Sequence, residues 1–352
     1  MAAPPLRVLF DSVEEMLHPS SLTGLLGAPV GSVSLTPLES NGFSANQLSY
    51  VQAGGRRLVL KQLRSDDWLT RGSHDRRCRS VAVWRTGLLD RLKPAVHHPI
   101  MAASRDGTDH ALLMWDCSAG LRRWGRSDRR RQLDQMVWSL ATMHARQWND
   151  NALADPVFGL ADVPSLVQTC WPCSWPPFED HPTARGLLQR GWTALLDLVA
   201  PDVCTTIEQI VSDPTALLRA LEHEPPTLLH GDYRPDNVAV MADQGVVAFD
   251  WQLAGHGPGV LDLAWLINGG DTFAYRGWAF GRYRDYLWDA LGDSFDAAGW
   301  ERSLALANLT EVLRKGNWTA LFAVEGDAER TSRFRAFIPA YNTFVREGAA
   351  FL

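Results

Sequence analysis

The chain lacks several features that mark membrane and secreted proteins. Its 352 residues contain no run of 18 or more apolar residues, which excludes a membrane-spanning helix of ordinary length. The first seven residues, Met-Ala-Ala-Pro-Pro-Leu-Arg, lack the apolar core of a secretion signal. The five cysteines are odd in number and scattered, which argues against a disulfide framework. Together these absences predict a cytoplasmic protein with reduced thiols.

The chain also lacks an excess of positive charge, because its 40 acidic residues outnumber its 34 lysines and arginines. The formal net charge is −6 and the sequence pI is about 5.9, whereas a nucleic-acid-binding domain favours a basic face and a pI above about 9. The one arginine-rich segment, residues 122–131, opens a helical pattern and is interpreted as a solvated face, with a polyanion contact as the alternative. The sequence therefore predicts neither nucleic acid nor membrane as a partner.

The most informative segment that is present spans residues 229–251. It begins Leu-His-Gly-Asp-Tyr-Arg-Pro-Asp-Asn and ends Val-Val-Ala-Phe-Asp-Trp. Two β-prone runs, 238–241 and 246–249, are joined by Ala-Asp-Gln-Gly, a suitable connection for a hairpin. Because a hairpin brings its two ends together, we expect Asn237, just before the first strand, to lie near Asp250, just after the second.

These residue types suit phosphoryl transfer. The side-chain oxygens of Asn237 and Asp250 suit a hard cation such as Mg²⁺, which also keeps phosphate oxygens in its shell. Asp232, one loop earlier, is free to accept a proton from an attacking hydroxyl. Asp-x4-Asn followed by a later Asp reproduces the order of base, second metal ligand and metal ligand in protein kinases.

The same block resembles the catalytic motif of the aminoglycoside phosphotransferase and choline kinase superfamily. That pattern is His-Gly-Asp-x4-Asn, then Asp-[Trp/Phe]-[Glu/Gln], then a Gly-x-x-x-x-Asp-Leu-Ala run. In this chain it occupies His230–Asn237, Asp250–Gln252 and Gly257–Ala264. The Asp-Tyr-Arg and Asp-Trp-Gln variants are more similar to bacterial relatives of ecdysteroid and choline kinases. The resemblance extends over roughly residues 30–320, but only residues 228–265 are highly specific.

The resemblance implies an α+β, bilobal, protein-kinase-like fold. It implies a small β-rich nucleotide-binding lobe at residues 1–115 and a larger, mostly helical catalytic and acceptor-binding lobe at 116–352. It also implies ATP and Mg²⁺ as cofactors and a small-molecule hydroxyl as acceptor. The expected roles are catalysis by Asp232 and Asn237, metal binding by Asn237 and Asp250, and structural support of the loop by His230 and Asp262. His230 would organise the loop, and Asp262 would accept its backbone N–H groups.

Local patterns agree with a β-rich first lobe. They predict strands at 32–35, 47–52, 57–62 and 111–115, a hairpin at Gly54-Gly55, helices at 77–92 and 128–147, an irregular segment at 170–187, and several helices after residue 260. The last strand leads into a polar break at 116–120, where a hinge between lobes belongs. Met114 and Asp116, at this hinge, are expected to contact the nucleotide.

Two further features of the first lobe are candidates for phosphate binding. Lys61 is one of only three lysines and lies in a predicted strand, as does the phosphate-binding lysine of kinases. The alternative is an edge-strand lysine that blocks strand pairing. Ser40, Asn41 and Gly42 open a polar loop between two strands that could cover phosphates, although an ordinary turn would look the same.

One residue that kinases use is missing. Kinases pair the phosphate lysine with a glutamate on the helix of the first lobe, but no glutamate occurs between Glu39 and Glu179. Where the family has Arg-Glu-Val-Ala, Ser80 occupies the place of the Glu. Asp75 or the Asp66-Asp67 pair are the alternative partners of Lys61. This departure leaves open a catalytically impaired pseudokinase that binds nucleotide or another ligand.

The acceptor is expected to bind the C-terminal helices. Protein kinases have an Ala-Pro-Glu tripeptide after the metal-binding Asp, and this chain has none, which favours a small molecule over a protein acceptor. The region after residue 260 is rich in tryptophan and in acids, which suits a cationic or amphipathic alcohol. Core tryptophans and solvated acids are the alternative. The residues concerned are Trp265, Trp278, Trp288, Trp300, Trp318, Asp271, Asp285, Glu311 and Glu325.

Overall fold

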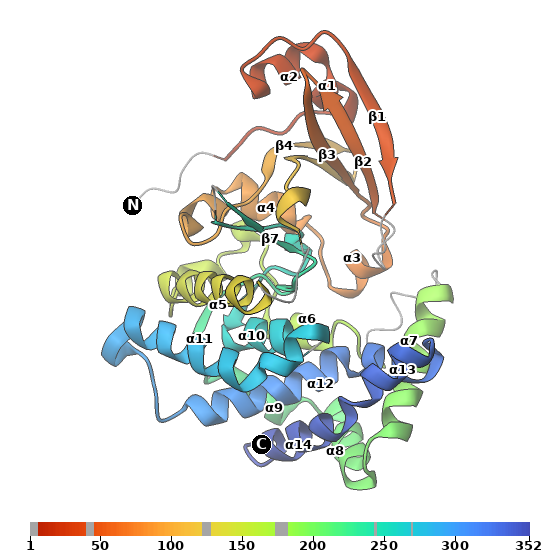
Figure 1. The fold of residues 1–352 in the computed structure, drawn as a ribbon, viewed down its shortest axis with the longest axis vertical. Helices are drawn as coiled ribbons and strands as arrows, with labels where there is room; N and C mark the ends of the chain where they lie inside the picture. The colour runs from red at the N-terminus through yellow and green to blue at the C-terminus, as the bar shows by residue number, and fades with distance from the viewer. Residues whose placement is uncertain (1–5, 40–45, 122–127, 173–181, 243–244, 269) are drawn as a thin grey trace.

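The chain folds into a β-rich part and a helical part, which are stacked along the long axis of the molecule (Figure 1). The computed structural model describes residues 6–39, 46–121, 128–172, 182–242, 245–268 and 270–352. The predicted α+β class, with a small β-rich lobe and a larger, mostly helical one, is confirmed. None of the described helices is long and apolar enough to cross a membrane.

The first part contains one antiparallel sheet with strand order β1-β2-β3-β5-β4. Its strands are β1 (Val33–Leu38), β2 (Gln47–Ala53), β3 (Arg56–Leu63), β4 (Ile100–Asp106) and β5 (Asp109–Trp115). Its helices are α1 (Val13–Leu17), α2 (Pro19–Leu26), α3 (Trp68–Gly72), α4 (Arg79–Arg85) and the short 3₁₀ helix η1 (Leu89–Leu92).

The predicted hairpin between β2 and β3 is confirmed. Gly54 and Gly55 both have positive φ, +55° and +73°, as a two-residue hairpin turn requires. Side chains alternate along β3, so that Leu58 and Leu60 pack with α1 and α2 in a small core. Lys61 lies on the opposite face, which is turned toward the second part of the molecule.

The second part is mostly helical. Its α-helices are α5 (Arg129–Arg146), α6 (Val163–Gln168), α7 (Pro182–Leu198), α8 (Pro201–Ser212), α9 (Thr215–Glu222), α10 (Val260–Ile267), α11 (Arg276–Leu291), α12 (Trp300–Glu325), α13 (Ala328–Arg335) and α14 (Ile338–Ala349). Its short strands are β6 (Pro226–Leu229), β7 (Val238–Met241), β8 (Gly245–Ala248) and β9 (Gly255–Pro258). Its 3₁₀ helices are η2 (Ser118–Gly120), η3 (Asn151–Ala154), η4 (Pro156–Phe158), η7 (Trp251–Leu253), η8 (Gly270–Tyr275) and η9 (Gly292–Ser294).

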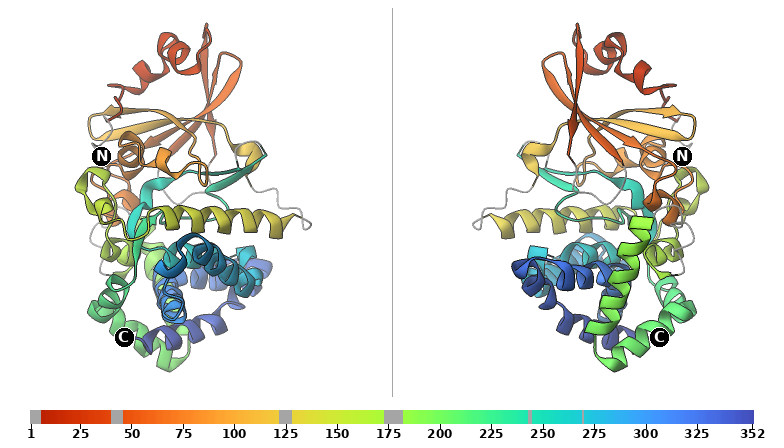
Figure 2. Two further views of the ribbon diagram at one scale, coloured as in Figure 1. Left: turned by 90° about the vertical axis from the view of Figure 1, so that its left-hand side faces the viewer. Right: turned by 90° about the vertical axis from the view of Figure 1, so that its right-hand side faces the viewer.

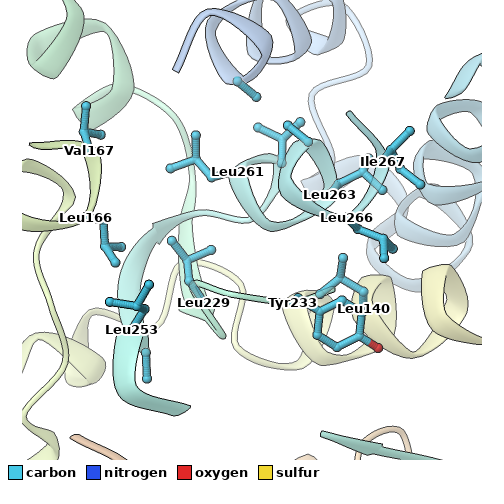
Figure 3. Packing of buried hydrophobic residues seen from close by; sticks show 14 of the residues in the cluster. Leu140, Leu166, Val167, Leu229, Tyr233, Leu253, Leu261, Leu263, Leu266 and Ile267 are labelled. Atoms are coloured by element: carbon cyan, nitrogen blue, oxygen red, sulfur yellow. The ribbon is translucent and has the colours of Figure 1, made fainter. Parts of the chain in front are cut away.

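Helix α5 lies between the two parts of the molecule (Figure 2). It packs against α11 on the helical side and against the β7–β8 hairpin on the other. The larger hydrophobic core surrounds it and includes Leu140, Leu229, Tyr233 and Leu253, all buried (Figure 3). Leu229 and Tyr233 flank residues 230–232, so this core anchors both ends of the loop that carries Asp232.

Three elements differ from the sequence prediction. The segment predicted to be irregular, 170–187, ends earlier than expected, because α7 begins at Pro182, and proline is favourable in the first turn of a helix. The predicted helix at 77–92 is interrupted after α4, because Gly87 has a φ of +71° and ends the α-helical path before η1. Strand β4 was not predicted: its apolar residues are small or few, and its strand character comes from pairing with β5. Strand β4 forms one edge of the sheet and contacts α1.

Candidate active site

The loop that connects β6 to β7 carries the predicted catalytic motif. It turns at Gly231, whose φ of +79° is unfavourable for any residue with a side chain. A Cβ atom at this position would overlap the backbone oxygen of Leu253. The glycine of the motif is therefore required both by its backbone conformation and by the close approach of η7.

Asp232 is held by hydrogen bonds to both of its carboxylate oxygens. Asn237 Nδ2 donates to Oδ2 over 2.7 Å, and Trp265 Nε1 donates to Oδ1 over 2.6 Å. Arg234 Nε lies 3.3 Å from Oδ1. The side chain is 18% exposed, so the carboxylate is fixed in orientation and still open to a ligand.

His230 and Asp262 lie beneath this loop. Asp262, in the first turn of α10, accepts the backbone N–H of His230 (2.6 Å) and that of Gly231 (2.8 Å). His230 Nε2 lies 3.0 Å from the carbonyl oxygen of Phe249, and its Nδ1 accepts the backbone N–H of Asp232. Burial lowers the pKa of His230, so the imidazole is neutral and is positioned to shape the loop.

Asp250 follows β8 with a φ of +66°, an uncommon conformation for a residue with a side chain. Such local strain occurs where the surrounding structure imposes it, often at functional sites. Its Oδ1 accepts a hydrogen bond from Lys61 Nζ at 2.8 Å. Burial raises the pKa of Asp250, but the charge and hydrogen bond of Lys61 outweigh this effect and the pKa lies below its ordinary value. Asp250 is thus ionised at neutral pH.

The structure brings Asp232, Asn237, Lys61 and Asp250 together in two linked pairs. Asn237 bonds to Asp232, and Lys61 bonds to Asp250. The backbone N–H of Phe249 donates to the Asn237 carbonyl oxygen at 3.1 Å, so the predicted hairpin does bring its two ends together.

Of the remaining predicted residues, the structure describes Met114 and Asp116. Ser40, Asn41 and Gly42 fall outside the described residues. Met114 is buried in β5 and belongs to the larger core. Asp116 forms an ion pair with Arg57 (2.6 Å) and accepts the backbone N–H of Ser118. A nucleotide contact at Met114 and Asp116 stays a prediction.

Lys61 is paired in a way that differs from all three sequence alternatives. Besides Asp250, its Nζ donates to Gln252 Oε1 at 2.9 Å. Asp75 instead accepts the backbone N–H groups of Arg77 and Arg79, and Asp66 pairs with Arg64 at the surface. The Ser80 hydroxyl is buried and has no hydrogen-bond partner among the described residues. The partners of Lys61 therefore come from the Asp250-Trp251-Gln252 turn and not from α4.

A cavity of about 370 Å³ opens beside Asp232 and Asp250. Its walls come from η7, α10, α12 and the region around α3 and α13. Its lining residues include Trp68, Gln252, Trp265, Leu266, Arg314, Lys315, Trp318, Phe322, Arg333 and Phe334. Its volume lies within the usual range for small-molecule sites, about 300–1,000 Å³.

Sequence reasoning did not assign specific roles to Gln252, Trp265 and Arg314. The sequence identifies Gln252 only as a motif position, yet its side chain accepts hydrogen bonds from Lys61 and from Asn46. The sequence predicts Trp265 in an acceptor pocket but does not predict its hydrogen bond to Asp232. Arg314 donates to the Gly231 carbonyl oxygen from a helix more than eighty residues later. No local pattern signals these contacts, which depend on how α10 and α12 pack.

Comparison with solved structures shows the fold. The chain is similar to a microcompartment-associated aminopropanol kinase (14% identity, TM-score 0.53, covering 91% of this chain and 95% of that one). It is also similar to a Plasmodium vivax ethanolamine kinase (13% identity, TM-score 0.52, covering 89% and 84%). A third similar structure is an amicoumacin kinase in complex with AMP-PNP and Ca²⁺ (12% identity, TM-score 0.50, covering 88% of each chain). The fold is thus kinase-like, as the sequence predicts.

Sequence comparison identifies the family. No curated protein sequence matches the chain. The model of the phosphotransferase enzyme family, APH, matches residues 36–306, which is more than half of the chain and includes the loop, the hairpin and α10. The chain therefore belongs to the phosphotransferase enzyme family.

Proposed function

We propose that this protein is an ATP-dependent phosphotransferase that moves the γ-phosphoryl group of ATP to a hydroxyl group of a small molecule. One observation carries the proposal: Asp232 and Asp250 line the same cavity, with Asn237 bonded to the first and Lys61 to the second. Two structural neighbours are named as an aminopropanol kinase and an ethanolamine kinase. These names support a small molecule with a hydroxyl group as the acceptor.

Asp232 is proposed as the group that orients the acceptor hydroxyl and takes its proton. Asn237 and Trp265 hold its two oxygens, so the carboxylate presents its remaining lone pairs in a fixed direction. Such positioning carries most of the rate in phosphoryl transfer, because the protein does little covalent chemistry itself.

Asn237 and Asp250 are the residues proposed to hold Mg²⁺. Among the described residues no group of three or more His, Cys, Asp or Glu side chains could hold a metal ion. Two protein oxygens completed by phosphate oxygens and water are the kind of set that Mg²⁺ takes. The donor set fits: Asp250 is ionised, and Asn237 uses Nδ2 toward Asp232, which leaves its Oδ1 as an acceptor. The ion would neutralise charge on the phosphates during transfer.

Lys61 is proposed to contact the nucleotide phosphates. It is only 7% exposed and is held by Asp250 and Gln252, so its ammonium group is fixed despite the missing glutamate. The pseudokinase alternative rests on the missing glutamate, and these two contacts of Lys61 weaken it because they hold the ammonium group without that residue. The intact Asp232, Asn237 and Asp250 point the same way.

The test is transfer of phosphate from ATP to a panel of small alcohols, followed by ³¹P NMR. We expect at least one alcohol to be phosphorylated, and Asp232→Asn to lower the rate about 100- to 10,000-fold, the usual contribution of a general base. Asp285→Asn, at an exposed site on α11, serves as the control and should keep the wild-type rate. Full turnover by Asp232→Asn would rule out the proposed base.

A further inference from the structure

The cavity beside Asp232 has two chemically distinct ends. The carboxylates that line it, among the described side chains, are Asp232, Asp236 and Asp250, which all come from the catalytic loop and the end of β8. Arg234 lies between two of them, 3.3 Å from Asp232 and 3.8 Å from Asp236. The end formed by α10 and α12 has aromatic and cationic side chains instead.

The aromatic side chains form the walls of this second end. Trp68 and Trp318 lie with ring centroids 6.5 Å apart, and Phe322 and Phe334 lie 5.2 Å apart. Trp265 is the wall closest to the reacting end, because its indole nitrogen bonds to Asp232. Surfaces of this kind favour a flat or apolar ligand body.

Two cations of α12 lie over the Trp265 ring. The Arg314 guanidinium carbon is 4.3 Å from the ring centroid, and Lys315 Nζ is 4.8 Å from it. Lys315 is matched by Glu311, a buried carboxylate 3.0 Å away. Arg314 is 5% exposed, and its guanidinium donates to the Gly231 carbonyl oxygen. Among the described residues, no carboxylate lies within ion-pair distance of Arg314. Glu311 interacts electrostatically with both cations of α12 but pairs directly with Lys315, so one described carboxylate of this helix faces two positive charges.

Three of the four acids that predicted a cationic acceptor, Asp285, Glu311 and Glu325, do not line this cavity. Asp285 pairs with Arg284 and Glu325 pairs with Arg190, in both cases between exposed side chains. Glu311 lines no part of the cavity and is paired with Lys315. Of the five tryptophans, Trp265 and Trp318 line the cavity. The side chain of Asp271 lies outside the description.

We infer that the acceptor is an anionic alcohol, with a flat apolar body between the tryptophans and a carboxylate or similar group that contacts Arg314. The inference rests on the proposed function, since it assigns the substrate class of the same site. With the anion at Arg314, the hydroxyl of the ligand would point toward Asp232. A buried guanidinium that has no ion-pair partner among the described residues is best satisfied by an anionic partner, and arginine binds carboxylates in a two-pronged geometry.

Three probes of similar size separate the alternatives: 4-(hydroxymethyl)benzoate, 4-(hydroxymethyl)benzamide and 4-(aminomethyl)benzyl alcohol. Binding to the full-length protein is measured by calorimetry with Mg²⁺ and a non-hydrolysable ATP analogue present. We expect the benzoate to bind at least tenfold more tightly than the benzamide, and the amine to bind most weakly. Tighter or equal binding of the benzamide or the amine, or no binding of the benzoate, would overturn the inference.

Two variants assign the preference to a residue. Arg314→Gln should reduce the benzoate-to-benzamide ratio to about one, and Arg314→Lys should restore part of it. The ratio is used because Arg314 also bonds to Gly231, so a general change in the loop affects both probes alike. Arg284→Gln, which removes a positive charge from an exposed site, should leave the ratio unchanged. An unchanged ratio in Arg314→Gln would contradict the assignment.

Transfer is followed in parallel by ³¹P NMR, which separates this inference from the proposed function. If the benzoate binds with the expected preference and receives no phosphate, the inference about the cavity holds and the proposed function fails for this probe. If the amine is phosphorylated in preference to the benzoate, the proposed function holds and the inference is overturned.

Discussion

Lys61 shows how a single missing residue is compensated at the site. The ammonium group contacts Asp250 and Gln252, and Gln252 in turn accepts from Asn46 in the first part of the chain. Arg79 of α4 donates to the backbone oxygen of Gln252 at 3.2 Å. Helix α4 therefore still supports the lysine, but through an arginine and the Gln252 backbone instead of a glutamate side chain.

We predict that Gln252→Ala raises the KM for ATP. A hydrogen bond to a charged group contributes about 1.5–3 kcal/mol, so its loss corresponds to about a 10- to 100-fold increase. Steady-state kinetics at saturating acceptor measures it. Ser80→Ala is the matched control, because the Ser80 hydroxyl lacks a partner among the described residues, and its KM should not change. A larger increase in the KM for ATP in Ser80→Ala than in Gln252→Ala would show that the partner of Lys61 lies on α4.

Trp265 is proposed as a positioning residue for Asp232. Trp265→Phe keeps the aromatic wall and removes the 2.6 Å hydrogen bond to Oδ1. We predict about a tenfold lower kcat, since one hydrogen bond to a charged group is lost, with no change in the KM for ATP. Trp278→Phe, a tryptophan that packs beneath Arg130, is the control. A change in both kinetic constants would indicate a general structural role instead.

At the residue scale, the sequence is informative about chemistry and much less so about neighbours. Asp232, Asn237 and Asp250 are predictable because a short loop and a hairpin fix their spacing. Trp265 and Arg314 reach the same loop from α10 and α12, and no local rule specifies which way these helices turn. For the same reason, the number of acidic residues between 271 and 325 does not predict that Asp285 and Glu325 form ion pairs at the surface instead of lining the cavity.

At the scale of elements, the catalytic loop is shaped by three close contacts. Asp262 at the start of α10 accepts two backbone N–H groups, η7 approaches Gly231, and Arg314 of α12 binds the Gly231 carbonyl oxygen. Burial raises the pKa of Asp262, but His144, His230 and the backbone N–H of His230 bring it below its ordinary value. The loop is thus tied to an ionised carboxylate within the helical core.

Two glycines with positive φ, Gly231 in this loop and Gly245 outside it, can be compared by mutation. Gly231→Ala would overlap the Leu253 backbone, whereas Gly245→Ala at the start of β8 meets open space. We predict that Gly245→Ala costs only the conformational penalty of about 1–2 kcal/mol, and that Gly231→Ala costs clearly more and abolishes transfer. Urea unfolding and activity measure both. Equal losses in the two variants would show that backbone conformation alone, and not the approach of η7, requires Gly231.

Elements were predictable where local rules dominate. The Gly54-Gly55 turn, the β7–β8 hairpin and α5 follow from turn chemistry and apolar periodicity. Strand β4 and the pairing of β6 with β9 depend on partners far along the chain, which local patterns do not contain. The division into lobes at residues 115 and 116 stays a prediction.

At the scale of the whole molecule, the two parts share one core. The larger hydrophobic cluster includes Leu63, Trp84 and Leu112 from the first part together with Leu140 and Leu228 from the second. The segment before β4 adds a direct connection: the backbone N–H of His97 donates to Val246, and that of Ala248 donates to His97. A change in this segment therefore affects the sheet and the catalytic hairpin together.

His98, the next residue, makes this connection sensitive to acid. It is 8% exposed, and its Nε2 lies 3.4 Å from Asp90. Burial lowers the pKa of His98 from its ordinary 6.5 to about 4. Between these values the unfolded chain binds a proton that the folded protein does not. The contribution of neutral His98 to the free energy of unfolding is therefore fully present above pH 6.5 and is lost as the pH falls toward 4.

We predict that His98 accounts for a loss of up to about 3 kcal/mol in the free energy of unfolding across this pH interval. His98→Gln cannot bind the proton, so its stability should fall less than that of the wild type as the pH is lowered, even if it is less stable at neutral pH. Urea unfolding at several pH values measures the two slopes. His223→Gln, at an exposed position, should keep the wild-type slope. Parallel curves for His98→Gln and the wild type would show that acid acts elsewhere, with His230 beneath the catalytic loop as the next histidine to test, since burial lowers its pKa too.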